Sequence, residues 1–272
     1  MNGTGLVVRT RRVARDRLTV WSAMREPEYR RLSRSYSLPG GFERVYCYHV
    51  RKTGGTSLNL SFLGLGGEDP LEVQRRIESS PLHRTTSGPY AFVAHQRKLL
   101  HQGHYFYGWS HLPAHRLALP PRTFTVTILR DPVERVVSYY NYLCQGDEPS
   151  MAFPVGELER SLSSGGFGAF LDVLPTTHLL SQLFMFSRTF DVPAATERIL
   201  ACSWVMFTDD YESGLSSLAD RLALALAPRR DRATKVETEI PGAGRDRLRE
   251  MLEPEYRMLG EVRSRLGQLR ST

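Results

Sequence analysis

A lysine followed by two glycines lies in residues 49–57, which read His-Val-Arg-Lys-Thr-Gly-Gly-Thr-Ser. A glycine-containing turn at the start of a helix attracts phosphate, because its backbone N–H groups can approach the anion closely and the helix dipole favours negative charge. A lysine beside such a turn can stabilise the charge on a leaving phosphate oxygen. In the Walker A loop the lysine follows the glycines, whereas Lys52 precedes them, so this order disfavours an ordinary NTP site. The residues predicted to bind the phosphate are Lys52, Thr53, Gly54, Gly55, Thr56 and Ser57.

A second anion-binding pattern is the sequence Arg-Asp-Pro-Val-Glu-Arg-Val-Val-Ser that begins at Arg130. The guanidinium group of Arg130 is a planar donor fork that suits a phosphate. Ser138 comes two turns into the helix expected from Pro132, so both side chains can face one anion. Taken singly, Arg130 could pair with Asp131 or Glu134, and Ser138 could be a small core residue. The presence of both loops in one chain favours the anion-binding interpretation.

Each of these loops follows a short apolar run that predicts a β-strand. Residues 45–50 and 123–129 are rich in β-branched and aromatic residues, and helical patterns follow from Leu58 and Val133. A third run, residues 204–207, also precedes a helical pattern. Strands that alternate with helices predict an α/β fold, with a three-layer parallel sheet and a P-loop-like strand-loop-helix. In such folds the ligand lies beyond the carboxyl ends of the strands.

Composition indicates one main domain and an anionic ligand. With 272 residues and 41% hydrophobic content, we expect a domain over residues 44–272 after a basic N-terminal arm over residues 1–43. The net charge is +7, and Lys52, Lys98 and Lys235 are the only lysines among 36 basic residues, a bias typical of GC-rich bacterial genomes. The sequence has no apolar run of membrane-spanning length and no signal-peptide pattern. Its three cysteines lack disulfide or zinc spacing, so we expect a cytoplasmic protein.

These residues resemble the PAPS-dependent sulfotransferases of the carbohydrate type, where PAPS is 3'-phosphoadenosine 5'-phosphosulfate. The pattern is nearest to the heparan sulfate 2-O-sulfotransferase branch and its bacterial relatives. The resemblance runs from about Val45 to the C-terminal helices, with motif-level matches confined to the two loops and residues 106–115. It implies that residues 52–57 bind the 5'-phosphosulfate, and that Arg130 and Ser138 bind the 3'-phosphate.

The same resemblance implies a catalytic base. Residues 106–115 match a Phe-Tyr-containing strand that ends in Gly-His in the family; here Ser110 replaces that glycine, and His111 resembles the catalytic histidine. A histidine suits a hydroxyl acceptor, because a pKa near neutrality lets it accept the proton. Gln182 stands where relatives have acceptor-contacting residues, with a core or capping amide as the alternative. Lys235 matches a basic loop that closes over the nucleotide in relatives, with a solvated loop lysine as the alternative. The histidines left open as alternatives to His111 are His49, His95, His104 and His115.

We therefore predict an enzyme that transfers a sulfuryl group from PAPS to a hydroxyl of a glycan or bacterial specialised metabolite, without a metal. In this in-line reaction His111 accepts the hydroxyl proton and Lys52 stabilises the leaving phosphate. One alternative is a magnesium-dependent ATP phosphotransferase with a divergent loop, for which Asp131 and Asp209 are poor metal ligands. Another is a non-catalytic basic protein that binds nucleic acid or another polyanion, although the arm lacks interleaved aromatic residues. We expect no nucleic-acid or membrane partner, and the oligomeric state stays open.

Overall fold

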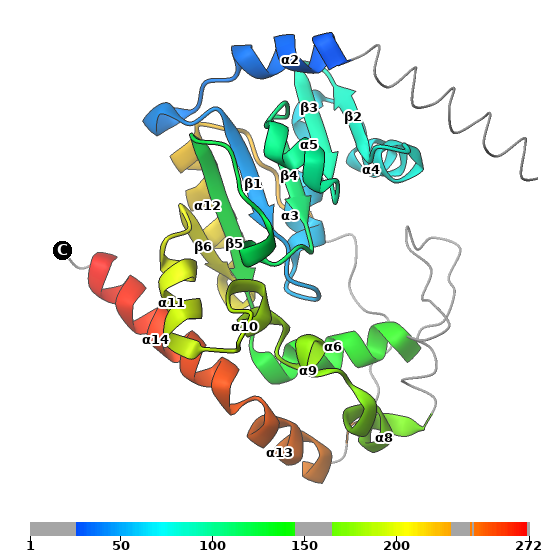
Figure 1. Ribbon diagram of the computed structural model, residues 1–272, viewed down its shortest axis with the longest axis vertical. Helices are drawn as coiled ribbons and strands as arrows, with labels where there is room; N and C mark the ends of the chain where they lie inside the picture. Colours follow the sequence, from blue (N-terminus) through cyan, green and yellow to red (C-terminus); the bar gives the residue numbers. More distant parts are fainter. Residues whose placement is uncertain (1–25, 145–164, 230–239, 241, 271–272) are drawn as a thin grey trace, which may run out of the picture.

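The computed structural model describes residues 26–144, 165–229, 240 and 242–270, and its centre is a six-stranded sheet (Figure 1). The strand order is β2-β3-β4-β1-β5-β6. Neighbouring strands pair in parallel, except for the antiparallel pair of β2 and β3. The predicted α/β class with a parallel sheet is therefore confirmed, and the one antiparallel strand of the described sheet is β2 at its edge. The strands are β1 (Arg44–Tyr48), β2 (Arg84–Ser87), β3 (Tyr90–Ala94), β4 (Tyr107–Ser110), β5 (Thr123–Leu129) and β6 (Trp204–Phe207).

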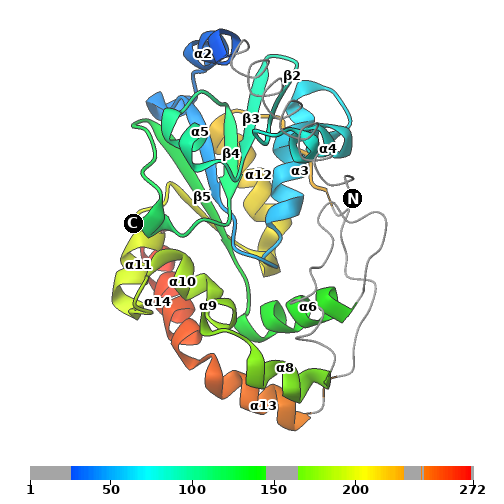
Figure 2. The ribbon, with the colours of Figure 1, turned by 45° about the vertical axis from the view of Figure 1, so that its right-hand side comes forward.

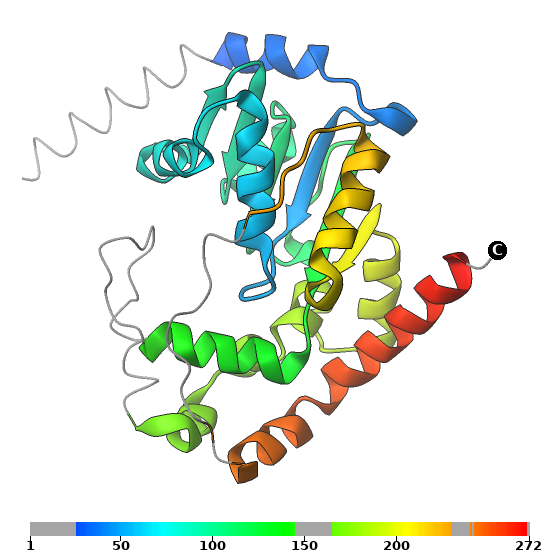
Figure 3. The ribbon, with the colours of Figure 1, turned by 180° about the vertical axis from the view of Figure 1, so that it is seen from behind.

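Helices cover both faces of this sheet, which gives three layers (Figure 3). Successive side chains of a strand point to opposite faces, so Cys47 packs with Leu58 of α3, whereas Tyr46 packs with Leu100 of α5. The helices are α2 (Glu26–Ser35), α3 (Gly55–Leu63), α4 (Pro70–Ser79), α5 (Arg97–Gln102), α6 (Pro132–Cys144), α8 (Gly166–Val173), α9 (Thr176–Leu179), α10 (Ser181–Phe186), α11 (Val192–Leu200), α12 (Tyr211–Leu222), α13 (Gly242–Met251) and α14 (Glu253–Arg270). Short 3-10 turns are η1 (Pro39–Gly41), η2 (Gly64–Gly66), η3 (Ala114–Arg116) and η4 (Thr208–Asp210). Among the described helices, none is both long and apolar enough to cross a bilayer.

Helix α6 begins directly after the carboxyl end of β5. The carboxylate of Asp131 accepts a hydrogen bond from the backbone N–H of Glu134 at 2.9 Å, and Pro132 occupies the first turn, so the Asp-Pro pair starts the helix as predicted. Figure 2 shows β5 running into α6, which lies beneath α3 and the loop that leaves β1. The helix therefore forms one wall below the carboxyl edge of the sheet.

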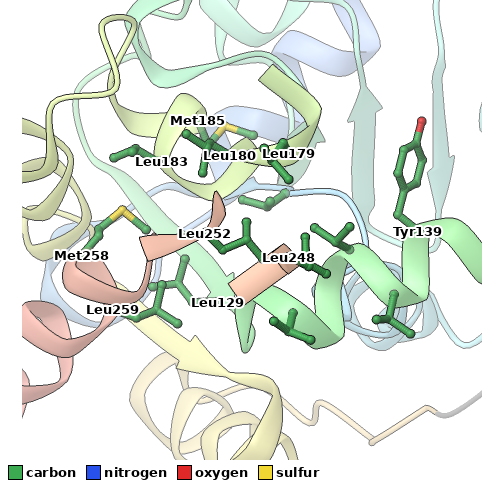
Figure 4. Close-up of a cluster of buried hydrophobic side chains, with 14 of the residues drawn as sticks. Leu129, Tyr139, Leu179, Leu180, Leu183, Met185, Leu248, Leu252, Met258 and Leu259 are labelled. Carbon is green, nitrogen blue, oxygen red and sulfur yellow. The ribbon is translucent and has the colours of Figure 1, made fainter. Parts of the chain in front are cut away.

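A second core lies between α6 and the C-terminal helices. Leu129, at the end of β5, lies near Leu248 of α13, near Leu252 in the turn between α13 and α14, and near Leu259 of α14 (Figure 4). Leu248 and Leu252 are fully buried, so α13 and α14 are part of the folded domain rather than an appendage. The C-terminal helices thus reach the strand end from which Arg130 follows.

The described part of the predicted N-terminal arm packs on the domain. Tyr29 of α2 is 2% exposed, and the guanidinium of Arg84 lies 4.2 Å from the centre of its ring. Glu26 pairs with Arg84 at 2.7 Å and with His104 at 2.8 Å. Figure 1 shows α2 at the end of the sheet opposite to α6. Residues 1–25 of the arm lie outside the described residues.

Candidate functional site

The predicted site residues gather at the carboxyl edge of the sheet. Lys52 follows β1, His111 follows β4 and Arg130 follows β5, and these three strands are adjacent and parallel. Their carboxyl ends therefore meet at one edge, where α/β folds bind ligands. His95 follows β3, which pairs in parallel with β4, and reaches the same edge.

The loop that leaves β1 contains residues in the left-handed backbone conformation, which only glycine adopts easily. Gly54 has a φ of 85°, and Lys52, although not glycine, has a φ of 66°. Gly55 is the first residue of α3, and a Cβ there would lie 2.2 Å from Cδ2 of His49 and 2.5 Å from its Nε2. Thr53 fixes the turn by donating its hydroxyl to the carbonyl of Val50 at 3.0 Å. The glycine pair thus lets the helix start and the imidazole of His49 pack closely.

Lys52 is held between Arg130 and α6. Its Nζ lies 4.6 Å from the centre of the Tyr142 ring, and its carbonyl accepts a hydrogen bond from Nη1 of Arg130 at 3.2 Å. Ser138 lies one helical turn before Tyr142, so both belong to the face of α6 that is turned toward the Lys52 loop. Ser138 is buried. The structure thus brings together Lys52, Arg130 and the part of α6 that carries Ser138.

The carboxylates near Arg130 are engaged elsewhere. Asp131 accepts from the backbone of Glu134 and from the hydroxyl of Tyr256 at 3.0 Å, while Glu134 pairs with Arg245 at 3.0 Å. Burial lowers the pKa of Arg130, and the charges of Glu134 and Asp131 oppose this effect. Among the ion pairs of the described residues, none joins Arg130 to either carboxylate. The alternative that the sequence left open, an ion pair of Arg130 with Asp131 or Glu134, is therefore absent from the described residues.

The side chain of Gln182 is a core amide. This is the alternative that the sequence analysis gave beside a contact with the acceptor. It is fully buried, and its Oε1 accepts from the backbone N–H of Arg130 at 2.8 Å. Its Nε2 donates to the carbonyl of Arg130 at 3.0 Å. The amide thus engages the backbone of Arg130 on both sides.

The ring of His111 has a defined orientation. Its Nδ1 lies 2.7 Å from the backbone carbonyl of His49 and, since a carbonyl only accepts, Nδ1 carries the proton. The neutral ring therefore has its free lone pair on Nε2. Burial lowers the pKa of His111 to about 4, the bond to His49 opposes this, and the charge of Arg51 lowers it further. The pKa of this buried ring therefore lies below the near-neutral range expected of the catalytic histidine. Ser110, which replaces the expected glycine, is buried; its hydroxyl bonds with that of Tyr46 at 2.6 Å and accepts from the N–H of Leu112 at 3.1 Å.

Two further imidazole rings adjoin His111, and a third adjoins one of these two. The ring centres of His49 and His95 lie 4.6 and 5.3 Å from that of His111, and His83 lies 6.2 Å beyond His95. Burial lowers the pKa of His95 to about 3. The alternative candidates His49 and His95 thus belong to the same cluster. His104 instead pairs with Glu26 of α2, and the ring of His115 packs on Phe184 of α10 with centres 5.6 Å apart.

Sequence reasoning missed Tyr142, His83 and Glu255. The one usable signal was for Tyr142, which lies four residues after Ser138 and so on the same helix face. His83 and Glu255 contact the other site residues only because the fold brings distant segments of the chain together. Lys235 lies outside the described residues.

The metal ligands considered for the ATP alternative have other partners. Asp209 binds Arg263 at 2.7 Å, and Asp131 binds Tyr256. Within residues 26–144, 165–229 and 242–270, no group of three or more His, Cys, Asp or Glu side chains is arranged to hold a metal ion. Comparison of the chain with protein-family models and with curated proteins found no match.

Proposed function

We propose that this chain is a PAPS-dependent sulfotransferase that acts on a hydroxyl of a glycan or specialised metabolite. One observation carries the proposal: residues 49–52 are held at one end by His111 and at the other by Arg130. His111 bonds to the carbonyl of His49 at 2.7 Å, and Arg130 bonds to the carbonyl of Lys52 at 3.2 Å. A base, a phosphate loop and a second anion-binding group are thus joined in one hydrogen-bonded unit. This is the set that a 3'-phosphorylated donor and a hydroxyl acceptor require.

When bound, PAPS supplies the sulfuryl group. The Nε2 atom of His111 accepts the proton of the acceptor hydroxyl as the acceptor oxygen bonds to sulfur. The bond between sulfur and the oxygen of the 5'-phosphate breaks, and that oxygen keeps the electron pair. Lys52 and the first backbone N–H groups of α3 stabilise the resulting negative charge. His111 then releases its proton to solvent, which its low pKa of about 4 favours.

Arg130 and Ser138 provide the recognition that separates this donor from ATP. Arg130 presents a guanidinium that no carboxylate of the described residues neutralises, and Ser138 lies on the α6 face turned toward the same loop. A phosphate on the 3'-oxygen of ribose would receive charge-assisted hydrogen bonds from Arg130 and a hydroxyl contact from Ser138. ATP carries only a hydroxyl at that position. Lys235, which lies outside the described residues, stays in the proposal only as the nucleotide-binding residue that the resemblance implies.

A binding comparison separates the proposed function from its two alternatives. Calorimetric titration would measure the affinity of the wild-type protein for PAP (3'-phosphoadenosine 5'-phosphate), ADP and ATP, with and without magnesium. We expect PAP to bind most tightly and magnesium to have no effect. Tighter, magnesium-dependent binding of ATP would instead support a phosphotransferase, and equal weak binding of all three would support a polyanion-binding protein. Either result would contradict the proposal.

Transfer itself would be measured with PAPS labelled with ³⁵S. Release of PAP together with label on a hydroxyl acceptor is the expected outcome with a matching glycan or metabolite.

A cytoplasmic location belongs to the same proposal. Cys47, Cys144 and Cys202 are all free thiols, as is usual for proteins of a reducing compartment.

A further inference from the structure

The end of β5 is bracketed by the side chain of Gln182 from α10. The amide accepts from the N–H of Arg130 at 2.8 Å and donates to its carbonyl at 3.0 Å, as a neighbouring strand would do. These two bonds fix the backbone from which the guanidinium of Arg130 extends. An amide, however, can make this pair of bonds only in one orientation, with its oxygen toward the N–H and its nitrogen toward the carbonyl.

Glu255 of α14 sets that orientation. Its Oε2 accepts from Nε2 of Gln182 at 3.1 Å, and its Oε1 accepts from the backbone N–H groups of Gln182 at 2.7 Å and Leu183 at 3.1 Å. An ionised carboxylate cannot donate, so the nitrogen of the amide must face Glu255. The oxygen of Gln182 is then left for the N–H of Arg130. Glu255 therefore determines how Gln182 meets Arg130.

Burying the carboxylate of Glu255 costs free energy unless its charge and its hydrogen-bonding capacity are both satisfied. Its side chain is 0% exposed, and Nε of Arg135, which is 1% exposed, lies 3.7 Å from Oε2. Arg135 also donates to the carbonyl of Leu179. A buried carboxylate needs both a countercharge and hydrogen bonds, and Glu255 has both. The carboxylate thus joins α14, the start of α10 and α6 directly behind Arg130.

We infer that Glu255 is a positioning residue for the phosphate-binding arginine, acting through Gln182. The inference rests on the proposed function, since it assigns Arg130 to the donor's 3'-phosphate. Glu255 does not touch the nucleotide; it holds the amide that holds the Arg130 backbone. Loss of this arrangement lets the guanidinium leave the 3'-phosphate position while the Lys52 loop still binds the 5'-phosphate.

Gln182→Met tests this relay. The substitution keeps the volume of the side chain and leaves the backbone N–H groups of residues 182 and 183, and Arg135, to satisfy Glu255. We expect the affinity for PAP to fall about tenfold and that for ADP to change less than twofold. In the Arg130→Ala background, Gln182→Met should cause no further loss for PAP. Glu255→Gln should show the same selectivity, because a glutamine no longer fixes the orientation of the amide.

The matched control is Thr196→Val, which removes a partly buried hydrogen bond of 3.2 Å from α11 to Glu261 of α14 that does not reach Arg130. Binding of both nucleotides to this control variant should be unchanged.

Thermal unfolding would be recorded for every variant. If the Gln182→Met protein does not fold, Gln182→Asn replaces it, because the shorter amide cannot reach both backbone groups of Arg130. Wild-type PAP affinity in the Gln182 variant, or equal losses for PAP and ADP, would overturn the inference alone. A wild type that does not prefer PAP to ADP would overturn the proposed function and this inference with it.

Discussion

Nδ1 of His111 donates to the backbone carbonyl of His49 at 2.7 Å, so the lone pair of the neutral imidazole is on Nε2. His49 begins the loop that leads to Lys52, and the proposed base is therefore bound to the proposed phosphate loop. A substitution that moves the carbonyl of His49 should therefore also move the ring of His111.

We expect His111→Ala to reduce kcat by roughly 10²- to 10⁴-fold, the usual contribution of a general base. The affinity for PAP should hardly change, because the contacts of His111 with the loop are with His49, which lies outside the residues 52–57 proposed to bind the phosphate. Steady-state kinetics and PAP titration measure the two quantities. The control is His104→Ala, which removes a histidine paired with Glu26 of α2 and should leave kcat intact. Full activity of His111→Ala would assign the base to another residue.

The pH dependence of the reaction should differ from that of an ordinary histidine. Because burial lowers the pKa of His111 from 6.5 to about 4, the ring stays neutral above that value. We expect kcat/KM to be flat from pH 8 down to about pH 5 and to fall as the pH drops toward 4. A decline centred near pH 6.5 would mean that the base is not this buried ring.

The stability of the protein should also fall in acid. His95, whose pKa is lowered from 6.5 to about 3, stays neutral in the folded state while its unfolded form gains a proton below pH 6.5. The unfolded state then binds more protons, so the free energy of unfolding decreases as the pH falls, by up to about 2 kcal/mol at pH 5 for this group. His95→Asn, which tolerates the left-handed φ of 58°, should reduce this decrease in urea unfolding experiments. An unchanged pH dependence would exclude His95 as its source.

Lys52→Ala should lower kcat by about 10²- to 10³-fold with the fold retained, because Lys52 stabilises charge on the leaving oxygen. Lys98→Ala provides the control, since Lys98 is an exposed lysine on α5. Circular dichroism would establish that both proteins are folded. Turnover of Lys52→Ala close to that of Lys98→Ala would remove Lys52 from the mechanism.

Gly55→Ala tests the close packing of α3 on His49. The new Cβ would lie 2.2 Å from Cδ2 of His49, so the imidazole must move and disturb the carbonyl that orients His111. We expect a loss of stability of about 1–3 kcal/mol together with reduced kcat. At Gly64, at the other end of α3, an added Cβ would meet nothing within 4 Å, so Gly64→Ala should be nearly neutral. Equal effects of the two substitutions would argue against the role of His49.

Local patterns in the sequence predicted the parts of the site that depend on neighbours in the chain. The run at residues 123–129 is β5, and the Asp-Pro pair after Arg130 starts α6. The left-handed conformation of Lys52 could not be predicted, because lysine has no preference for it. The contact between Gln182 and Arg130 could not be predicted either, because it depends on α14 bringing Glu255 into contact with Gln182. Long-range packing, rather than local propensity, decides these positions.

The most direct test of the account is a calorimetric cycle in which PAP and ADP are titrated into the wild-type protein and Arg130→Ala. Hydrogen bonds to charged groups contribute roughly 1.5–3 kcal/mol, so Arg130→Ala should weaken PAP binding about 10- to 150-fold. The affinity for ADP, which lacks the 3'-phosphate, should hardly change, and the coupling between the substitution and the phosphate isolates their contact. Equal losses for the two nucleotides, or a wild type that binds PAP no more tightly than ADP, would contradict the assignment of a PAPS donor.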